Sequence, residues 1–273
     1  MPNKPDTRRE RKNLIEFVDK TSVRKISMLR ESNRPQRLQI ESWILSQIRM
    51  RKINVPKVLD YYRNSRDQEV LVMERIYGQP ISLVAPKEKR EAMLEIGPQM
   101  VQLANIASNY GWIDPASFAG NSNSWRMFIL NYVKTYGERL FSSNIISRKD
   151  LDVVYRLIDN LDIEISKSFL LNRDFRLSHF LRDDYGKIWI LDWENAILGD
   201  QLHDLAIFAV RYGEGTLWQN LKTGYGFGHL PPKYYLYKIV ALIGIIDYCQ
   251  KNRIEYSGRM KKLMKSISFF KGC

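Results

Sequence analysis

Residues 13–19 and 22–29 are short segments of mixed apolar and polar residues that predict a pair of strands joined at residues 20–21. Residues 34–51 instead carry apolar side chains close to helical spacing, and Pro56 ends that region. A second strand pair is predicted at residues 58–62 and 69–73. The first part of the chain is therefore expected to form a small mixed lobe that ends near Gly78 and Pro80.

After this boundary the pattern becomes mainly helical. Amphipathic helices are predicted at residues 87–108, 124–141 and 147–167. Short apolar segments that suit strands lie at residues 169–171, 180–182 and 188–191. Residues 183–186 supply a hairpin turn between the last two segments. The tail from residue 203 is again helical, and its Gly-rich segment 224–228 is expected to be a flexible loop on the substrate side. We predict an α+β chain of two domains, residues 1–78 and residues 79–273.

The composition favours a folded protein of the reducing cytoplasm. Of 273 residues, 44% are hydrophobic and 12% aromatic, which is enough for a buried core. The most apolar run, residues 239–246, is too short to cross a bilayer, so no membrane partner is expected. The polar N-terminus argues against a secretory signal. The two cysteines have neither the number for a disulfide framework nor the spacing for a metal site.

The formal net charge of +13 has three interpretations. A solvated basic surface is the simplest, and nucleic-acid binding and an anionic substrate are the alternatives. The charge is spread along the chain, without zinc-finger spacing or an RNA-reading aromatic motif. We therefore do not expect a nucleic-acid partner.

Two aspartates mark the predicted hairpin as a place for chemistry. Asp174 follows the strand at residues 169–171, and Asp192 ends the far strand of the hairpin. A hairpin folds these two positions toward the same end of the structure. Two carboxylates there suit metal-assisted phosphoryl transfer, since one can accept a proton from an attacking hydroxyl and the other can hold a magnesium ion that bridges the donor phosphates.

These segments resemble the aminoglycoside phosphotransferase and choline kinase superfamily, whose members are relatives of protein kinases. The segments that carry the resemblance are Asn172-Arg173-Asp174, His179, Leu191-Asp192-Trp193-Glu194 and the element from Gly199 to Ala206. The resemblance implies a protein-kinase-like bilobal fold, with ATP and Mg²⁺ as cofactors and Mn²⁺ as a possible substitute. It implies that Asp174 is the catalytic residue and that His179 and Asp192 are metal ligands.

The N-terminal half resembles the same superfamily. Residues 23–26 are similar to its phosphate-binding lysine strand, which makes Lys25 the lysine that faces the donor phosphates, although Lys20 and Arg24 are nearby competitors. Glu41 on the following helix would be its ion-pair partner. Residues 71–78 resemble the segment that leads into the adenine-binding hinge. On this resemblance the cofactor-binding residues are Lys25, Glu41, Met73, Glu74 and Ile76.

The chain departs from the family pattern in three places. His179 stands where most members have Asn, and an imidazole is a softer ligand than an amide oxygen; macrolide phosphotransferases are similar in having His there. His179 could ligate metal, hydrogen-bond Asp174 or be a buried structural residue. Asn172 replaces the usual His, which braces the loop. Gly78 is the first glycine, so the Gly-rich phosphate loop is missing. A truncated start, nucleotide binding by lysine, metal and hinge, and lost catalysis are the alternatives.

The charge of the C-terminal segment bears on the acceptor. Residues 200–273 contain five acidic residues against eleven lysines and arginines. A polycationic acceptor would be repelled there. We therefore predict an ATP-dependent phosphotransferase that acts on a hydroxyl of a neutral or anionic small molecule. A catalytically impaired pseudokinase, or a nucleotide-binding regulator of the same fold, is the alternative.

Overall fold

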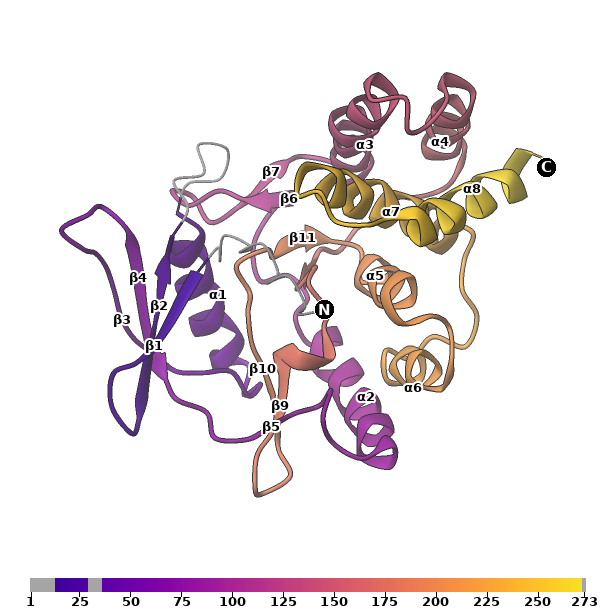
Figure 1. Cartoon of the computed structure of the whole chain (residues 1–273). Coiled ribbons are helices and arrows are strands. Elements are labelled where there is room, and N and C mark those ends of the chain that lie inside the picture. The colour runs from indigo at the N-terminus through magenta and orange to yellow at the C-terminus, as the bar shows by residue number, and fades with distance from the viewer. Residues whose placement is uncertain (1–12, 29–35, 272–273) are drawn as a thin grey trace, which may run out of the picture.

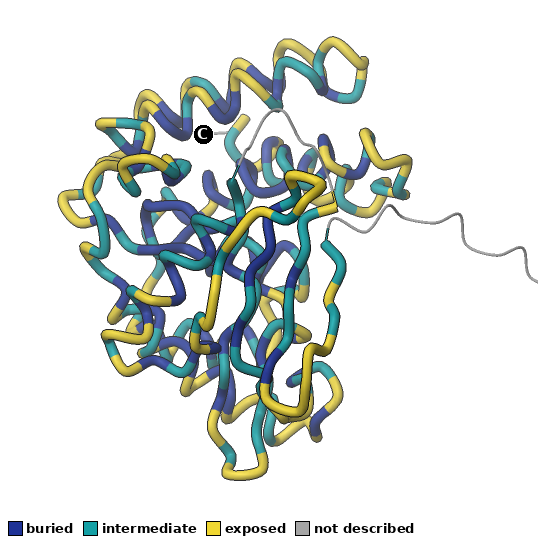
Figure 2. The backbone as a smooth tube through the Cα atoms, turned by 90° about the vertical axis from the view of Figure 1, so that its left-hand side faces the viewer, coloured by how far each residue is buried: buried dark blue, intermediate teal, exposed yellow. Residues whose placement is uncertain are grey.

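The computed structural model describes residues 13–28 and 36–271. The first elements form what we call the N-terminal lobe (Figure 1). They are β1 (Asn13–Phe17), β2 (Ser22–Ser27), α1 (Arg37–Met50), β3 (Val58–Arg63) and β4 (Glu69–Glu74). These strands make an antiparallel sheet in the order β1-β2-β4-β3, and α1 packs against β3 and β4. Figure 2 faces this sheet and shows exposed loops at both of its ends.

The predicted strands of this lobe are present, and β4 is the most buried of them. Leu71 of β4 is fully buried, and it pairs with both Lys25 of β2 and Tyr61 of β3. Of the predicted end positions, 28 lies beyond β2 and 36 lies before α1, whereas positions 29, 34 and 35 fall outside the described residues. The sheet therefore fixes Lys25 at the centre of the lobe.

The remaining elements form what we call the C-terminal lobe. Its helices are α2 (Pro86–Val101), α3 (Trp125–Ser142), α4 (Arg148–Asn160), α5 (Leu202–Tyr212), α6 (Thr216–Gly224), α7 (Lys233–Lys251) and α8 (Ser257–Lys271), with a 3-10 turn η1 (Leu177–His179). Its strands are β5 (Gln79–Pro80), β6 (Tyr110–Ile113), β7 (Gly120–Ser122), β8 (Phe169–Leu171), β9 (Phe180–Arg182), β10 (Ile188–Ile190) and β11 (Ile197–Gly199). They form two antiparallel sheets, β10-β9-β5 and β7-β6-β11-β8. No helix of the described residues combines the length and apolar character needed to span a bilayer.

The hairpin β9–β10 has the predicted form. Its turn uses Gly186 at φ +80°, and the Asp183 N–H donates to the Lys187 carbonyl. The Asp183 carboxylate accepts hydrogen bonds from the N–H groups of Tyr185 and Lys187. Aspartate and glycine are the residues that such turns favour. The turn thus joins β9, which follows His179, to β10, which precedes Asp192.

Two predicted helices are shorter than expected. The helix predicted at residues 87–108 ends at Val101, and the one predicted at residues 147–167 ends at Asn160. The Arg126 guanidinium donates to the carbonyls of Ile158, Asp159 and Leu161 at the end of α4. A side chain from α3 therefore satisfies carbonyls that the helix leaves unpaired.

The Gly-rich segment at residues 224–228 was misinterpreted. Gly224 ends α6 against α2, where a Cβ on Gly97 would lie 2.4 Å from the Gly224 carbonyl carbon. Residues 224–228 do not line the cleft between the lobes that is described below. Gly224 is present because two helices approach closely, and the segment is not a loop on the substrate side.

Candidate active site

The Lys25 ammonium lies among three carboxylates. Its Nζ is 2.8 Å from Glu41 Oε2 on α1 and 2.7 Å from Asp192 Oδ1 after β10. The third carboxylate, Glu194, is 3.1 Å from the same nitrogen and also accepts a hydrogen bond from the Asn13 amide. The Lys25 side chain is only 6% exposed. The expected ion pair with Glu41 is therefore formed, and two further acids join it.

Arg24 and Lys20, the alternative candidates for the lysine strand position, do not face the cleft. Arg24 lies on the opposite face of β2, where its Nε is 2.5 Å from Glu16 Oε2. The Lys20 carbonyl accepts a hydrogen bond from the Tyr77 hydroxyl, in the loop between β1 and β2. Neither residue lines the cleft. Because alternate residues of a strand face opposite sides, the register that buries Lys25 turns Arg24 away.

The cluster carries more negative than positive charge. Burial opposes the charge of Lys25, but the surrounding carboxylates outweigh it and hold the Lys25 pKa well above its usual value. Burial, with help from Asp192 and Glu194, raises the pKa of Glu41 to about 7 despite the attraction of Lys25. Asp192 is 29% exposed against 2% for Glu41, so Lys25 outweighs burial and lowers the Asp192 pKa. A further cation beside Asp192 would relieve the excess of negative charge.

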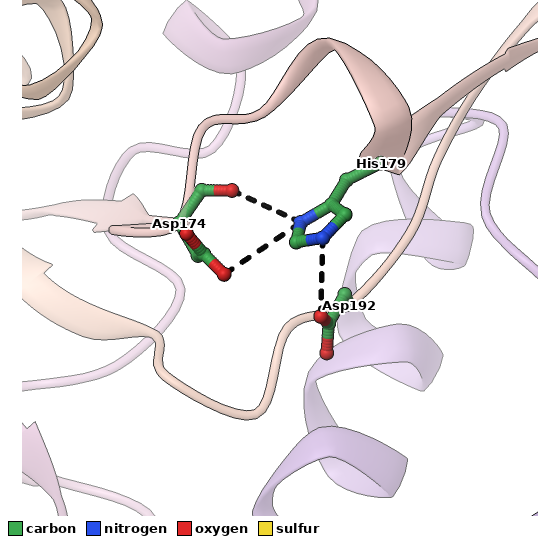
Figure 3. Close-up of side chains that lie close together, drawn as sticks. All are labelled: Asp174, His179 and Asp192. Atoms are coloured by element: carbon green, nitrogen blue, oxygen red, sulfur yellow. Dashed lines mark hydrogen bonds and ion pairs between the residues drawn. The ribbon is translucent and has the colours of Figure 1, made fainter. Parts of the chain in front are cut away.

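Asp174, His179 and Asp192 meet at one point (Figure 3). One candidate ligand atom from each lies within 4.8 Å of the others. The ring nitrogen Nδ1 of His179 is 3.0 Å from the Asp174 carbonyl oxygen, and Nε2 is 3.5 Å from Asp192 Oδ2. A carbonyl oxygen only accepts hydrogen bonds, so Nδ1 carries a proton, and Nε2 is the ring nitrogen that faces Asp192.

This donor set fits a divalent cation. The carboxylate oxygens are hard ligands of the kind that Mg²⁺ prefers, and the imidazole also suits Mn²⁺ and other first-row transition metals. His179 is oriented by the Asp174 carbonyl in the way that metal-ligating histidines usually are. The three carboxylates around Lys25 carry more negative charge than its ammonium offsets, and this excess would attract a cation. Asp192 and His179 are the residues that would hold the ion.

The loop before Asp174 is held by a buried carboxylate. Asp204 of α5 accepts hydrogen bonds from the N–H groups of Asn172 at 2.7 Å and Arg173 at 2.9 Å. The Asn172 amide donates to the Asp192 carbonyl, and its oxygen accepts from the Asp174 N–H. Arg173 and Asp192 both have positive φ, at 60° and 61°, a conformation that is uncommon outside glycine and concentrates at functional sites. Asp204 therefore braces this loop.

Two guanidinium groups contact the carboxylate of Asp174. Arg176 Nε and Arg211 Nη1 each donate to Asp174 Oδ1 at 2.8 Å. Burial opposes ionisation, but Arg211 and then Arg176 outweigh it and lower the Asp174 pKa. Asp174 is therefore ionised at neutral pH.

A cleft of about 2900 Å³ lies between the lobes. The residues expected to form the site all line it: Lys25, Glu41, Met73, Glu74, Ile76, Asp174, His179 and Asp192. Ile15 and Val23 of the N-terminal sheet and Leu181 of β9 add apolar surface to the same cleft. One cleft therefore joins all eight residues that were expected to form the site.

The segment after β4 is anchored beside this cleft. The Glu74 N–H donates to the Lys57 carbonyl, and the Arg75 N–H donates to the Thr21 carbonyl, both at 2.8 Å. Within residues 13–28 and 36–271, no hydrogen bond to the Ile76 N–H is found. The backbone at Ile76 thus retains a donor at the cleft edge.

The loop between β1 and β2 is no substitute for a phosphate loop. Asp19 Oδ1 accepts hydrogen bonds from the N–H groups of Thr21 and Ser22 at 2.6 and 2.8 Å. An aspartate therefore occupies the N–H groups that would have to face an anion. The Thr21 carbonyl is bonded to Arg75, so the loop lies at the hinge end of the sheet. The prediction of a missing Gly-rich loop extends to residues 1–12, which lie outside the described residues.

A sequence profile of the phosphotransferase enzyme family matches residues 17–237. The chain belongs to this family. Members of the family share the kinase-like α+β fold, and solved structures agree with that assignment. A thermostable mutant of aminoglycoside phosphotransferase APH(4)-Ia, bound to AMP-PNP and hygromycin B, is 16% identical, with a TM-score of 0.68 over 93% of each chain. The GDP complex of wild-type aminoglycoside 2'-phosphotransferase-IIIa is 13% identical, with a TM-score of 0.66 over 97% of this chain and 91% of that one. No curated protein sequence matches the chain.

Membership in the phosphotransferase family confirms the resemblance and the fold class predicted from the sequence. The site contains residues that the sequence did not single out. Glu194 was part of the quoted Asp192-Trp193-Glu194 motif, but its pairing with Lys25 depends on two distant segments meeting. Arg211 is one of many basic residues, and only the packing of α5 brings it to Asp174.

Proposed function

We propose that this chain transfers the γ-phosphoryl group of ATP to a hydroxyl of a neutral or anionic small molecule. The observation that carries this proposal is the meeting of Asp174, His179 and Asp192 in one cleft, with Lys25 bound to Asp192. Related structures hold AMP-PNP with hygromycin B, or GDP with kanamycin, which supports a nucleotide donor and a small acceptor.

Asp174 is the catalytic residue in this proposal. Its carboxylate accepts the proton of the acceptor hydroxyl as the hydroxyl oxygen bonds to the γ-phosphorus, while the bond from that phosphorus to the β–γ bridging oxygen breaks and ADP leaves. The transition state is loose, so positioning and charge stabilisation matter more than a strong base. The lowered pKa of Asp174 is compatible with that role, because the carboxylate is ionised when the substrate arrives.

Lys25, His179 and Asp192 serve the donor phosphates. Lys25 neutralises phosphate charge, and Glu41 holds the Lys25 ammonium in place. Asp192 and His179 would hold the divalent cation, which would offset the charge of the donor phosphates. Without nucleotide, the Glu194 carboxylate also forms an ion pair with the Lys25 ammonium. When phosphates arrive they compete with these carboxylates for the ammonium.

The hinge binds the adenine base. Met73 gives the cleft an apolar wall, and the Glu74 carbonyl and the Ile76 N–H provide an acceptor and a donor for the base edge. The domain boundary is proposed at residue 78, where the hinge ends. A Cβ on Gly78 would lie 2.7 Å from the Arg182 carbonyl oxygen, so the chain crosses close to β9 there. Nucleotide binding is thus held by lysine, metal and hinge, without a Gly-rich loop.

Binding and turnover of nucleotide test the proposal together. Melting temperature is measured with AMP-PNP and Mg²⁺ or Mn²⁺, and phosphate transfer from ATP is measured over a panel of hydroxyl compounds. We expect metal-dependent stabilisation by AMP-PNP that Asp192→Ala removes, and transfer that Asp174→Asn removes. Stabilisation without transfer to any compound would favour the pseudokinase. Absence of metal-dependent nucleotide binding would exclude both.

A further inference from the structure

The positive charge at the end of the cleft beside Asp174 supports a further inference, which rests on the proposed function. We propose that the acceptor carries a phosphate or carboxylate group close to its reactive hydroxyl, and that Arg211 and the basic turn between α7 and α8 bind that group. This narrows the acceptor from a neutral or anionic molecule to an anionic one.

The first observation is the imbalance at Asp174. Arg176 and Arg211 together bring two positive charges to one carboxylate, and both use the same oxygen, Oδ1. A guanidinium has five N–H donors in a planar fork. The hydrogen bonds to Asp174 use one donor of each group. The side chains of Arg176 and Arg211 are 50% and 23% exposed, so other donors face the cleft. Such forks match the oxygens of phosphate and carboxylate groups.

The second observation is that the acids of this region are already engaged. Asp247 of α7 receives Arg139 through two contacts, Nε–Oδ1 at 2.9 Å and Nη2–Oδ2 at 3.0 Å. The Glu255 carboxylate accepts a hydrogen bond from the Ser257 N–H at the start of α8. A cationic acceptor would have to compete with these partners. Both acids on this part of the cleft wall, Asp247 and Glu255, therefore already have a partner within the chain.

The third observation is a surplus of cations on the turn between α7 and α8. Lys251, Arg253, Arg259 and Lys262 line the cleft there, against Asp247 and Glu255. The Arg253 side chain is exposed, and no hydrogen bond or ion pair of its guanidinium is found in the described part of the chain. Lys262 Nζ on α8 donates to the Val210 carbonyl at 3.1 Å, which places the start of α8 beside Arg211. The basic side chains therefore converge on the same end of the cleft as Asp174.

These positions limit where the anionic group can lie on the acceptor. A base must come within hydrogen-bond distance of the hydroxyl it deprotonates. Because Arg211 is itself hydrogen-bonded to that base, an anion held by Arg211 lies only a few bonds from the reactive hydroxyl. A neutral polyol would leave the guanidinium donors without a charged partner, and a polyamine would add repulsion.

A matched series of hexoses tests the proposal. Glucose 6-phosphate, glucuronate, glucose and glucosamine share a ring; the first two carry an anionic group at C6, glucose carries no charge, and glucosamine carries an ammonium group at C2. Binding of each is measured by saturation-transfer NMR on the full chain saturated with Mg²⁺ and AMP-PNP. We expect both anionic sugars to bind at least about tenfold more tightly than glucose, and glucosamine to bind most weakly. Comparison of the first two sugars distinguishes a phosphate from a carboxylate group.

Two variants and one control locate the effect. Arg211→Gln is expected to remove the preference for anionic sugars. Arg253→Gln, at an exposed position that cannot unfold the lobe, is expected to weaken it severalfold. Lys261→Gln, on α8 but outside the cleft, should change nothing. Equal binding of all four sugars, no binding of any, or an equal effect of Lys261→Gln would overturn the proposal. Retained metal-dependent AMP-PNP binding in those cases would leave the phosphotransferase function standing.

Discussion

His179 Nε2 lies 3.5 Å from Asp192 Oδ2, while the opposite nitrogen of the ring faces the Asp174 carbonyl at 3.0 Å. The contact with the carbonyl orients the ring so that Nε2 faces Asp192. The imidazole therefore stands where a ligand to a divalent ion is needed. The identity of that ligand should influence which metal the protein uses.

His179→Asn should shift the metal preference toward Mg²⁺. An amide oxygen is a harder ligand than an imidazole, so the ratio of Mn²⁺ to Mg²⁺ affinity should fall by roughly tenfold. The measurement is the metal concentration that gives half-maximal stabilisation by AMP-PNP, taken for both ions. An unchanged ratio would mean that His179 does not contact the metal.

Asp174→Asn and Asp192→Asn should have separable effects. Loss of the base should lower kcat by roughly 10²–10⁴-fold with nucleotide affinity retained. Loss of Asp192 should weaken metal-dependent nucleotide binding itself, since the ion loses an anionic ligand. Asp184→Asn, at an exposed position of the β9–β10 turn, is the control. Equal losses of nucleotide affinity in Asp174→Asn and Asp192→Asn would contradict the assigned roles.

Sequence reasoning was sufficient where a residue's role follows from local pattern. Lys25 was identified from the resemblance of residues 23–26 to the lysine strand of the family, and the strand register buries it while Arg24 faces outward. Gly186 and Asp183 mark the β9–β10 turn in the sequence itself. These features depend on residues within a few positions of one another, so they can be recognised without the fold.

Sequence reasoning failed where a residue's role depends on distant packing. The strands β7 and β11 are three residues each and lack a repeating apolar pattern, so only their partners define them. The end of α4 is set by Arg126 from another helix. Arg211 reaches Asp174 across 37 positions of sequence. None of these contacts leaves a local signal.

Metal–nucleotide binding should release a proton from Glu41. Without ligand the pKa of Glu41 is raised to about 7 by burial and by the neighbouring acids. A cation beside Asp192 lowers that pKa, so protons leave when the complex forms at or below about pH 7, and none leave well above it. The dependence of calorimetric binding enthalpy on buffer ionisation enthalpy, at pH 6.5 and 8.5, measures this release.

Glu41→Gln is the control for that release. The variant keeps a hydrogen-bond acceptor for Lys25 but cannot titrate. The difference between wild type and variant removes the titration of the nucleotide itself. Equal proton release in both proteins would show that Glu41 is not the source.

Asp204 should give activity and stability opposite pH dependences. Burial, against the N–H groups of Arg173 and Asn172, raises its pKa from 3.8 to about 6. Protonation below about pH 6 removes an acceptor from the loop before Asp174, so kcat should fall there. The folded state holds this proton more tightly than the unfolded state, so the Asp204 contribution to the free energy of unfolding decreases as pH rises from about 4 to about 6.

Asp204→Asn tests both directions. The variant should have a reduced kcat with nearly unchanged nucleotide affinity, and it should lose the inflection of kcat near pH 6. Its urea unfolding free energy should depend less on pH between 4 and 6 than that of the wild type. A variant that keeps the inflection would assign it to another group.

The ring of Trp43 on α1 stacks on Phe118, in the loop between β6 and β7, with centroids 4.9 Å apart and an angle of 10°. Gln39 of the same helix donates to the Pro115 carbonyl in that loop. These contacts tie the helix that carries Glu41 to the C-terminal lobe. Trp43→Ala should therefore loosen the Glu41–Lys25 pair and weaken AMP-PNP binding by severalfold.

A double-mutant cycle with Phe118→Ala separates this link from general destabilisation. If the stacked pair positions α1, the two single changes should weaken nucleotide binding equally, and the double change should weaken it no further. The coupling in unfolding free energy should be about 0.5–1.5 kcal/mol, as for other aromatic pairs. Additive losses of nucleotide affinity would mean that Glu41 keeps its place without the stack, and that α1 is positioned by its packing on β3 and β4 alone.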